Sequence, residues 1–409
     1  MSSTVMMCSK WSYRSISDIS TVVSGGTPSR NKQAYWANGT IPWVKTGQLS
    51  KQKITIDDID EFITEEALSN SSAKIVPAGT ILIAMYGQGK TRGTSAVLQD
   101  EAAINQACAA LLLNTQVDGN YVFQQLLYNY DNLRKISNSG SQDNLSIDLI
   151  KSYKIPFPPG EDSVFEQRRI AEFLGTWDEA IEKLERLIEA KEKRLSWIRA
   201  NILTGKVRIN GFSSKWKQII FLEIASRVTR SVGKERVAPV SISAGKGFVL
   251  QEEKFGRNIA GKQYSKYTLL FPEEFTYNKG NSKTYECGCV YQWRGKAPVA
   301  VPNVFVSFSL NAKLADARFI SHFFEADLHA NELRKFINSG VRNDGLLNVT
   351  PDCFFKIILS LPELPEQKAI ANILDTTSQE IDILRAELIM FQKQKRGLMQ
   401  KLLTGTWRV

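Results

Sequence analysis

One feature of this chain constrains its fold more than any other: the segment 165–209 recurs, without a gap, as the segment 365–409. Both copies end in the tripeptide Leu-Thr-Gly, with an arginine three residues later. The same offset extends upstream, where the Leu-Arg-Lys run at 133–135 returns at 333–335. Two copies 200 residues apart do not make a solenoid, which stacks many short units. They predict a duplicated module in the order domain, helix, domain, helix.

Both repeated segments carry apolar residues that step alternately by four and by three over four heptads. This period of 3.5 residues is typical of a coiled coil. Prolines precede each segment, and Gly205 and Gly405 follow it, so we expect a helix over about residues 166–204 and its repeat. The two seams are each other's natural partners and predict an antiparallel coiled coil. The alternative is two amphipathic helices that pack separately on their own domains. The predicted seam consists of Leu174, Trp177, Ile181, Leu184, Ile188, Leu195, Ile198, Leu374, Ile381, Leu384, Leu388, Phe391, Lys395 and Leu398.

The repeat also predicts the register of this pairing. Two antiparallel helices related by 200 residues should pair about a pseudo-twofold axis near Arg186 and Ala386. Trp177 then lies opposite Lys395, and the lysine ammonium can sit over the indole face while its stem covers apolar surface.

The sequence between the helices predicts two globular domains of mixed α/β type, so the expected fold class is α+β. Apolar runs flanked by Gly, Asn and Ser suggest strands at 80–84, 109–113 and 304–308, and helical spacing marks 121–135 and 318–336. The expected divisions are residues 1–162 and 211–364 for the two domains, and 163–210 and 365–409 for the helical regions.

The charge of the chain favours an acidic partner. Lys and Arg number 52 against 42 Asp and Glu, a net of +10, of which residues 1–160 carry only +1 and residues 211–364 carry +7. Nucleic acid is therefore a partner class to test. We find no apolar run of about 18 residues for a membrane span, and Met1 to Lys10 has no signal-peptide core. With five cysteines and no disulfide pattern, we expect a soluble cytoplasmic protein and no membrane partner.

A glycine-rich segment at 84–91 fits a relaxed phosphate-loop pattern, with Ala84 in place of the first glycine. That mechanism needs a helix to begin at Lys90-Thr91, but residues 92–97 favour a strand. We therefore interpret the segment as a hairpin tip that presents Lys90 and Arg92 to DNA.

Other residues that suggest chemistry do not assemble into a catalytic or metal site. Cys287 and Cys289 fall on one face of a predicted strand, in a core, and zinc needs about four ligands while the chain has only His322 and His329, which we expect on one helix in structural roles. The nuclease-like Glu366-Gln367-Lys368 equals Glu166-Gln167-Arg168 in the repeat, so both are predicted first turns of helices. No motif for amino-group methylation is present.

The other polar residues of the two domains suggest a binding function. Polar and basic residues interleave with aromatic ones in loops of both domains, and such side chains contact base edges and phosphates. A solvated loop is the simpler interpretation of any single residue, so the prediction depends on the clusters. The candidate DNA-binding residues are Thr27, Ser29, Arg30, Lys45, Gln48, Tyr86, Gln88, Lys90 and Arg92 in the first domain, and Tyr277, Asn278, Lys279, Lys283, Gln292 and Arg294 in the second.

Taken in order, these segments resemble the DNA-specificity subunits of type I restriction–modification systems over essentially the whole chain. The resemblance rests on Gly-Gly-Thr-Pro-Ser at 25–29, the glycine-rich loop at 87–93, the two Glu-Gln pairs and the two Leu-Thr-Gly ends. Single motifs are moderately specific, and their order is highly specific.

The resemblance implies two target-recognition domains that each contact half of a bipartite DNA site, and a coiled coil that sets their separation. It implies no catalysis and no cofactor in this chain. Two modification subunits would carry S-adenosylmethionine and methylate adenine, and restriction subunits would use ATP and Mg²⁺, in a prokaryotic cytoplasm. The near-neutral first domain departs from two equally basic halves. A fused modification enzyme or nuclease, and a coiled-coil protein with peptide-binding domains, stay as alternatives.

Overall fold

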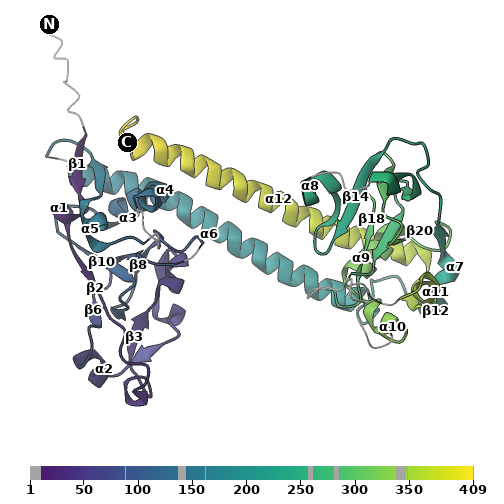
Figure 1. The fold of residues 1–409 in the computed structure, drawn as a ribbon, viewed down its shortest axis with the longest axis horizontal. Coiled ribbons are helices and arrows are strands. Elements are labelled where there is room, and N and C mark those ends of the chain that lie inside the picture. Colours follow the sequence, from purple (N-terminus) through teal and green to yellow (C-terminus); the bar gives the residue numbers. More distant parts are fainter. Residues whose placement is uncertain are drawn as a thin grey trace, which may run out of the picture. The chain divides into compact units, whose positions relative to one another are not determined.

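The structure is a computed structural model that describes residues 11–87, 89–136, 144–161, 163–256, 261–280, 285–337, 347 and 349–408. It divides into two compact units, residues 1–185 with 386–409 and residues 186–385. Each unit contains one mixed α/β domain together with half of α6 (Ser163–Ile202) and half of α12 (Leu364–Leu402). Within each unit the two helix halves lie side by side (Figure 1). The predicted fold class, two α/β domains with two long antiparallel helices, is confirmed.

The first unit contains two sheets and a two-stranded pair, with the order β2-β10-β7-β8-β4 in one sheet, β5-β3-β9-β6 in the other, and β1 paired with β11. Its strands are β1 (Ser12–Ser15), β2 (Ser20–Ser24), β3 (Ile41–Val44), β4 (Lys53–Ile54), β5 (Phe62–Ile63), β6 (Lys74–Val76), β7 (Ile81–Ala84), β8 (Ser95–Leu98), β9 (Ala102–Ile104), β10 (Cys108–Leu113) and β11 (Lys154–Phe157). Its shorter helices are α1 (Ile16–Ile19), α2 (Glu65–Ser69), α3 (Gly119–Tyr128), α4 (Tyr130–Lys135) and α5 (Ile147–Ser152), with 3-10 turns at Gln33–Tyr35, Thr46–Ser50 and Ile56–Asp58.

The second unit repeats this plan except that, among its described residues, no strand takes the place of β4. Its orders are β13-β20-β17-β18 and β15-β14-β19-β16, with the pair β12-β21. Its strands are β12 (Lys217–Ile220), β13 (Ala225–Val228), β14 (Ala238–Ser243), β15 (Gly247–Leu250), β16 (Thr268–Leu270), β17 (Phe275–Asn278), β18 (Cys289–Gln292), β19 (Val299–Val301), β20 (Val306–Leu310) and β21 (Ile358–Leu361). Its shorter helices are α7 (Phe221–Ile224), α8 (Gln251–Phe255), α9 (Ala317–Glu325), α10 (Ala330–Arg334) and α11 (Pro351–Phe355), with a 3-10 turn at Gly261–Lys266. The duplication seen in the helices therefore extends to the sheets.

The main core of the first unit lies where its domain meets both long helices. Tyr121 of α3 and Leu174 of α6 are fully buried in one cluster with Leu402 and Leu403 of the α12 end. In the second unit, Phe221 packs against Phe308 at 5.1 Å between ring centroids. Burying such a side chain contributes about 1.5–3 kcal/mol. Apolar packing therefore anchors the first domain to both long helices, and in the second unit it joins α7 to β20 within the domain.

Most predicted elements are present, but two predicted helices are broken. The runs at 80–84, 109–113 and 304–308 correspond to β7, β10 and β20. The helical run 121–135 is split between α3 and α4, and the run 318–336 is split between α9 and α10. Asp327 takes a left-handed φ of 56°, which ends the helical path. His322 and His329 consequently do not share a helix, so that prediction is wrong.

Glycines end both long helices, as the sequence predicts. Gly205 and Gly405 have φ of 71° and 76°, in the left-handed region that stops a helix. A Cβ at Gly405 would lie 2.5 Å from the ring of Trp11, and one at Gly205 would lie 3.3 Å from the ring of Trp216. Each glycine thus gives both the turn and the space for a tryptophan that precedes the first strand of its unit.

Candidate nucleic-acid interface

The two helices of the first unit pair in an antiparallel way near the predicted register, although the contacts of Trp177 and Lys395 differ from the predicted ones. Lys395 of α12 forms an ion pair with Asp178 of α6, the neighbour of Trp177. The ring of Trp177 instead packs edge-on against Phe391, at 5.7 Å between centroids. The expectation that the lysine ammonium sits over the indole is therefore wrong. A buried ammonium is stabilised more by a carboxylate that it can hydrogen-bond than by an aromatic face.

The pairing in the second unit is antiparallel as well. Lys191 Nζ lies 2.6 Å from Glu380 Oε1, and Arg385 lies 2.5 Å from Glu192. All fourteen predicted seam residues are buried or half-buried in the structure. The alternative of two separately packed helices does not fit these contacts.

The helix ends are joined by an ion pair that occurs twice. Arg208, beyond the end of α6, donates to both carboxylate oxygens of Glu366 at 2.7 and 2.8 Å. Arg408, beyond the end of α12, donates to Glu166 at 3.0 and 2.5 Å. Both glutamates are nearly buried, so these bidentate bonds fix the start of each helix to the end of the other. The sequence analysis does not predict this ion pair, although each copy of the repeat contains both the glutamate and the arginine.

The glutamines beside these glutamates fix each domain to its helix. Gln167 Oε1 accepts a hydrogen bond from the backbone N–H of Asp118 at 2.9 Å, and Gln367 Oε1 accepts one from Asp316 at 2.9 Å. Asp118 and Asp316 are the N-caps of α3 and α9. The Glu-Gln pairs are thus structural parts of the first helical turns, as the repeat predicted, and the nuclease interpretation fails.

The glycine-rich segment is the connection between antiparallel strands β7 and β8. No helix begins at Lys90-Thr91, and β8 begins at Ser95. The predicted hairpin is therefore present, and the phosphate-loop alternative lacks its helix. Tyr86 and Lys90 are exposed, Arg92 is half-buried, and Gln88 lies outside the described residues.

The loops between β2 and β4 gather several of the predicted cations around one carboxylate. The Arg30 guanidinium lies 3.7 Å from the ring centroid of Trp36 and 2.6 Å from Glu61. Lys45 Nζ lies 2.5 Å from Glu61 as well, and Gln48 donates to Asp60 at 2.7 Å.

These contacts set the ionisation of the cluster. Burial opposes ionisation of Glu61, but hydrogen bonds from Lys45 and Arg30 outweigh burial and lower its pKa. The hydrogen bond that Lys45 donates to Glu61 raises the pKa of Lys45. Asp60 and Glu61 neutralise these two cations locally. This part of the first domain therefore carries charges of both signs close together and little net charge. Among the other candidates here, Thr27 hydrogen-bonds Gln106, and Ser29 is exposed.

In the second unit, one predicted DNA-binding residue is placed wrongly. Tyr277 is fully buried, its hydroxyl donates to the Cys287 carbonyl at 2.8 Å, and its ring stacks on Phe354 at 4.5 Å. It therefore belongs to the core and cannot contact DNA. The sequence does contain an indication of this burial: Tyr277 lies two residues after Phe275, and this spacing puts both rings on one face of β17.

The remaining candidates of the second unit are less enclosed. Asn278 and Lys279 are half-buried and donate to the carbonyls of Ile242 and Val349 at 3.4 Å each. Gln292 ends β18 and is half-buried. Lys283 lies outside the described residues.

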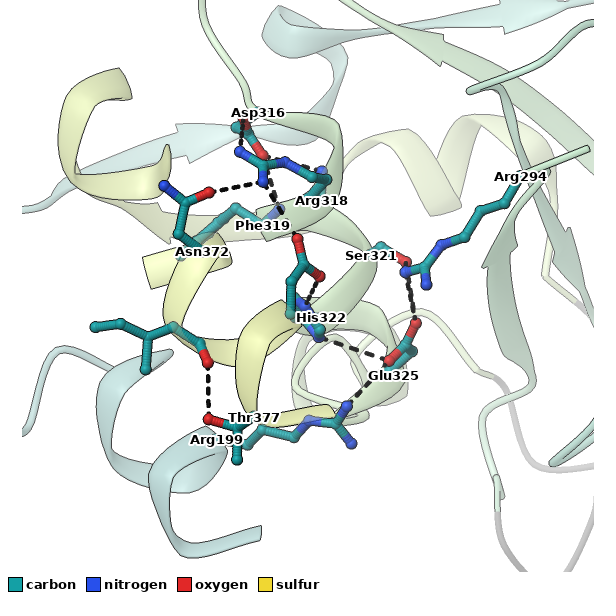
Figure 2. A network of polar contacts seen from close by, with 12 residues as sticks. Arg199, Arg294, Asp316, Arg318, Phe319, Ser321, His322, Glu325, Asn372 and Thr377 are labelled. Atoms are coloured by element: carbon teal, nitrogen blue, oxygen red, sulfur yellow. Dashed lines mark hydrogen bonds and ion pairs between the residues drawn. The ribbon is translucent and has the colours of Figure 1, made fainter. Parts of the chain in front are cut away.

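Arg294 joins a polar network where α9 meets both long helices (Figure 2). It donates to Ser321 at 3.0 Å and to Glu325 at 3.3 Å, and Arg199 of α6 reaches Glu325 at 3.4 Å. On the other side of α9, His322 Nε2 lies 2.8 Å from Asp375 Oδ1 of α12. This network links the domain of the second unit to both helices, and it gives the exposed Arg294 a structural task within the unit.

The cysteine pair lies in the core as predicted, but only Cys289 is in a strand, because Gly288 turns the chain with φ of 80° before β18. Burial raises the pKa of Cys289 to about 12, so its thiol stays protonated. Among the described residues, no three His, Cys, Asp or Glu side chains are grouped to hold a metal ion. None of the described helices is long and apolar enough to cross a membrane.

Parts of this chain are similar to DNA-specificity proteins of type I restriction–modification systems. Residues 8–192 match the family described as type I restriction modification DNA specificity domain. The chain is 29% identical over 194 residues to the type I restriction enzyme EcoR124I/EcoR124II specificity subunit of Escherichia coli, covering 46% of each. It is 30% identical over 188 residues to the MjaIX specificity subunit of Methanocaldococcus jannaschii, covering 45% of this chain and 41% of that one. The matches thus span about half the length of these relatives.

A solved structure shares the fold over nearly the whole chain. The S subunit of a type I restriction–modification system from M. genitalium aligns with a TM-score of 0.58 and 14% identity, covering 98% of both chains. At this identity the likeness concerns the fold alone.

Proposed function

Because residues 8–192 match the type I restriction modification DNA specificity domain, we propose that the chain is the sequence-specific DNA-binding subunit of such an enzyme. Residues 1–162 and 211–364 would be its two target-recognition domains, each contacting one half of a bipartite site. The observation that carries the proposal is the duplicated unit, in which sheets of closely similar strand order belong to a domain that the equivalent glutamine fixes to a long helix. Duplicated domains on paired helices suit two half-sites at a fixed separation.

The proposal includes no catalytic role for this chain. S-adenosylmethionine, ATP and Mg²⁺ would be bound by modification and restriction subunits. In support, the long helices expose apolar side chains that their mutual pairing does not cover: Phe165, Phe173, Ile389 and Met390 in the first unit, and Leu187, Trp197, Ile373 and Ile383 in the second. A partner subunit that packs on the helices would cover these side chains. Its presence in both units supports the binding of two modification subunits.

The proposal is tested by sequencing the methylated bases of a host with and without this gene. We expect one bipartite adenine-methylated motif that disappears with the gene. Methylation that is unchanged by the deletion would contradict the function. If the purified chain transferred a methyl group alone, the enzyme alternative would replace it.

A gel shift with mixed duplex DNA separates DNA binding from the peptide-binding alternative. We expect a shift that weakens steeply as salt rises, because phosphate contacts release counterions. Native mass spectrometry with the modification subunit should give a two-to-one complex, and a one-to-one complex at saturation would refute the proposed stoichiometry.

A further inference from the structure

The two units contain one hairpin each at the same place in the fold. Residues 85–94 connect β7 to β8, and residues 279–288 connect β17 to β18, in sheets that share the order of four strands. Gln88 and residues 281–284 of these connections lie outside the described residues. Gly93 and Gly288, near the ends of these connections, have φ of 82° and 80°. The equivalence comes from strand pairing and does not depend on sequence similarity.

A backbone hydrogen bond also recurs at the start of each hairpin. The N–H of Leu145 donates to the carbonyl of Met85, the first residue after β7, at 3.0 Å. The N–H of Leu347 donates to the carbonyl of Lys279, the first residue after β17, at 3.0 Å. The segment that follows α4 or α10 thus holds the hairpin base in both units.

In the first unit, one arginine of α4 holds the hairpin further along. Arg134 donates through one guanidinium nitrogen to the Gly89 carbonyl at 2.7 Å and through another to the Tyr130 hydroxyl at 2.6 Å. That hydroxyl donates in turn to the Lys90 carbonyl at 2.5 Å. The Arg134 stem is close enough that a Cβ at Gly93 would lie 3.0 Å from it. Two consecutive carbonyls of the hairpin are therefore tied to α4.

In the second unit, the arginine at the matching position of the repeat also reaches its hairpin. Arg334 ends α10, and it donates to Glu286 at 3.1 Å and to Asn331 of its own helix at 2.9 Å. Glu286 belongs to the β17–β18 connection. The Leu-Arg-Lys run is one of the few similarities that the two domains keep upstream of the long helices.

We propose that Arg134 and Arg334 are positioning residues, which hold Gly89 and Lys90 of the first hairpin and Glu286 of the second in the arrangement that contacts DNA. The inference rests on the function proposed above and adds the residues that fix its recognition loops. A loop held in its bound shape loses less conformational freedom when it binds, so affinity and base discrimination both improve. Arg134 acts through the loop, because one terminal nitrogen donates to the Gly89 carbonyl and the other donates to the Tyr130 hydroxyl. That hydroxyl in turn donates to the Lys90 carbonyl.

The test uses the full chain assembled with its modification subunits and a duplex carrying the motif found by methylome sequencing. Arg134→Ala should weaken binding about tenfold, within the range expected for losing one base or phosphate contact. It should also reduce discrimination against single-base changes in one half of the motif and leave the other half unchanged. Lys135→Ala is the matched control, since it removes an exposed cation from the same helix, and it should change binding less than about twofold.

A double-mutant cycle with Lys90→Ala distinguishes positioning from direct contact. If Arg134 acts through the loop, Arg134→Ala should add little in the Lys90→Ala background. A full additive loss would mean that Arg134 contacts DNA itself, and would overturn the inference. Tyr130→Phe removes the hydroxyl bridge alone and should weaken binding in the same direction, which keeps the test available if the arginine variant fails to fold.

Arg334→Ala should reduce discrimination in the other half of the motif. Loss of discrimination in both halves from either variant would indicate general destabilisation and would also overturn the inference. If the wild-type complex failed to bind the duplex, the proposed function itself would fail. If it bound while Arg134→Ala and Arg334→Ala matched it, only the positioning role would be refuted.

Discussion

A buried histidine should make the second unit sensitive to mild acid. His329 is completely buried at the start of α10, where its ring packs edge-on against Phe324 at 5.0 Å. The nearest carboxylate oxygen, Asp327 Oδ1, lies 3.6 Å from Nδ1, beyond hydrogen-bonding distance. A charge on this ring would be poorly compensated, so we expect His329→Phe to remove a pH dependence that the wild-type protein shows.

The size of the effect follows from the pKa of His329. Burial lowers it from 6.5 to about 4. Between these pH values the unfolded chain binds a proton that the folded chain does not, so the free energy of unfolding falls as pH decreases. The stability that the neutral ring preserves is complete above about pH 6.5 and is lost as pH approaches 4. At about 1.4 kcal/mol for each pKa unit, the loss reaches about 3 kcal/mol.

Hydrogen exchange of the α9 and α10 peptides at pH 7.5 and pH 4.5, corrected for intrinsic rates, measures this loss in the second unit alone. His329→Phe keeps the ring volume, and His329→Asn introduces the residue found at the matching position 129. Both variants should flatten the difference between the two pH values, although Asn costs packing at either one. An unchanged difference in both variants would refute the reasoning.

Four further perturbations test other parts of the account. Lys395→Leu should destabilise the first unit by about 1–3 kcal/mol in urea unfolding because it removes the ion-pair partner of the half-buried Asp178 carboxylate, and adding Asp178→Asn, which removes the charge and keeps an acceptor for Gln124, should restore most of that loss; no recovery would contradict the pairing. Replacing Lys90 and Arg92 with Ala should weaken DNA binding by about 1–3 kcal/mol and flatten its salt dependence, and unchanged affinity at moderate salt would return the hairpin to a solvated turn. Exchanging residues 211–364 for the domain of another family member should change one half of the methylated motif; a change in both halves would contradict modular recognition. Inserting one heptad at matched positions of both long helices should lengthen the spacer by about three base pairs, since seven residues rise about 10.5 Å; methylation at the original spacing would show that the helices do not set it.

The long helices could be predicted from the sequence because their pattern is local and repeated. A spacing of 3.5 residues identifies the buried stripe, and glycine identifies the end, without knowledge of any distant contact. The patterns that predict strands at 80–84 and 109–113 are also local, because each is a continuous apolar run between turn residues. The hairpin at Lys90 followed from the absence of a helix start after it.

Side-chain contacts between distant segments could not be predicted in the same way. The heptad spacing predicts an aromatic partner for Lys395 because it shows the helix seam alone, and the carboxylate of Asp178 lies just beside that seam. The polar residues that follow Tyr277 predict a binding loop there, although Tyr277 lies in a buried strand. Both errors arise because spacing along the chain fixes a face, while the chemistry of a neighbour depends on tertiary packing.

The residues that the two units share have a different task from the residues in which they differ. Residues that recur in both units fix each domain to the helices, as Gln167 and Gln367 do, or hold the recognition hairpin, as we propose for Arg134 and Arg334. Residues that differ change the surface instead: Arg30 stacked on Trp36 belongs to the first unit, and residues 211–364 carry most of the net charge. Two domains that must present different surfaces from one scaffold can vary the loops only if the contacts that fix them are kept. If the chain binds DNA as proposed, the salt dependence of binding should come mainly from the second domain, which carries most of the net positive charge, and both domains should contribute base discrimination.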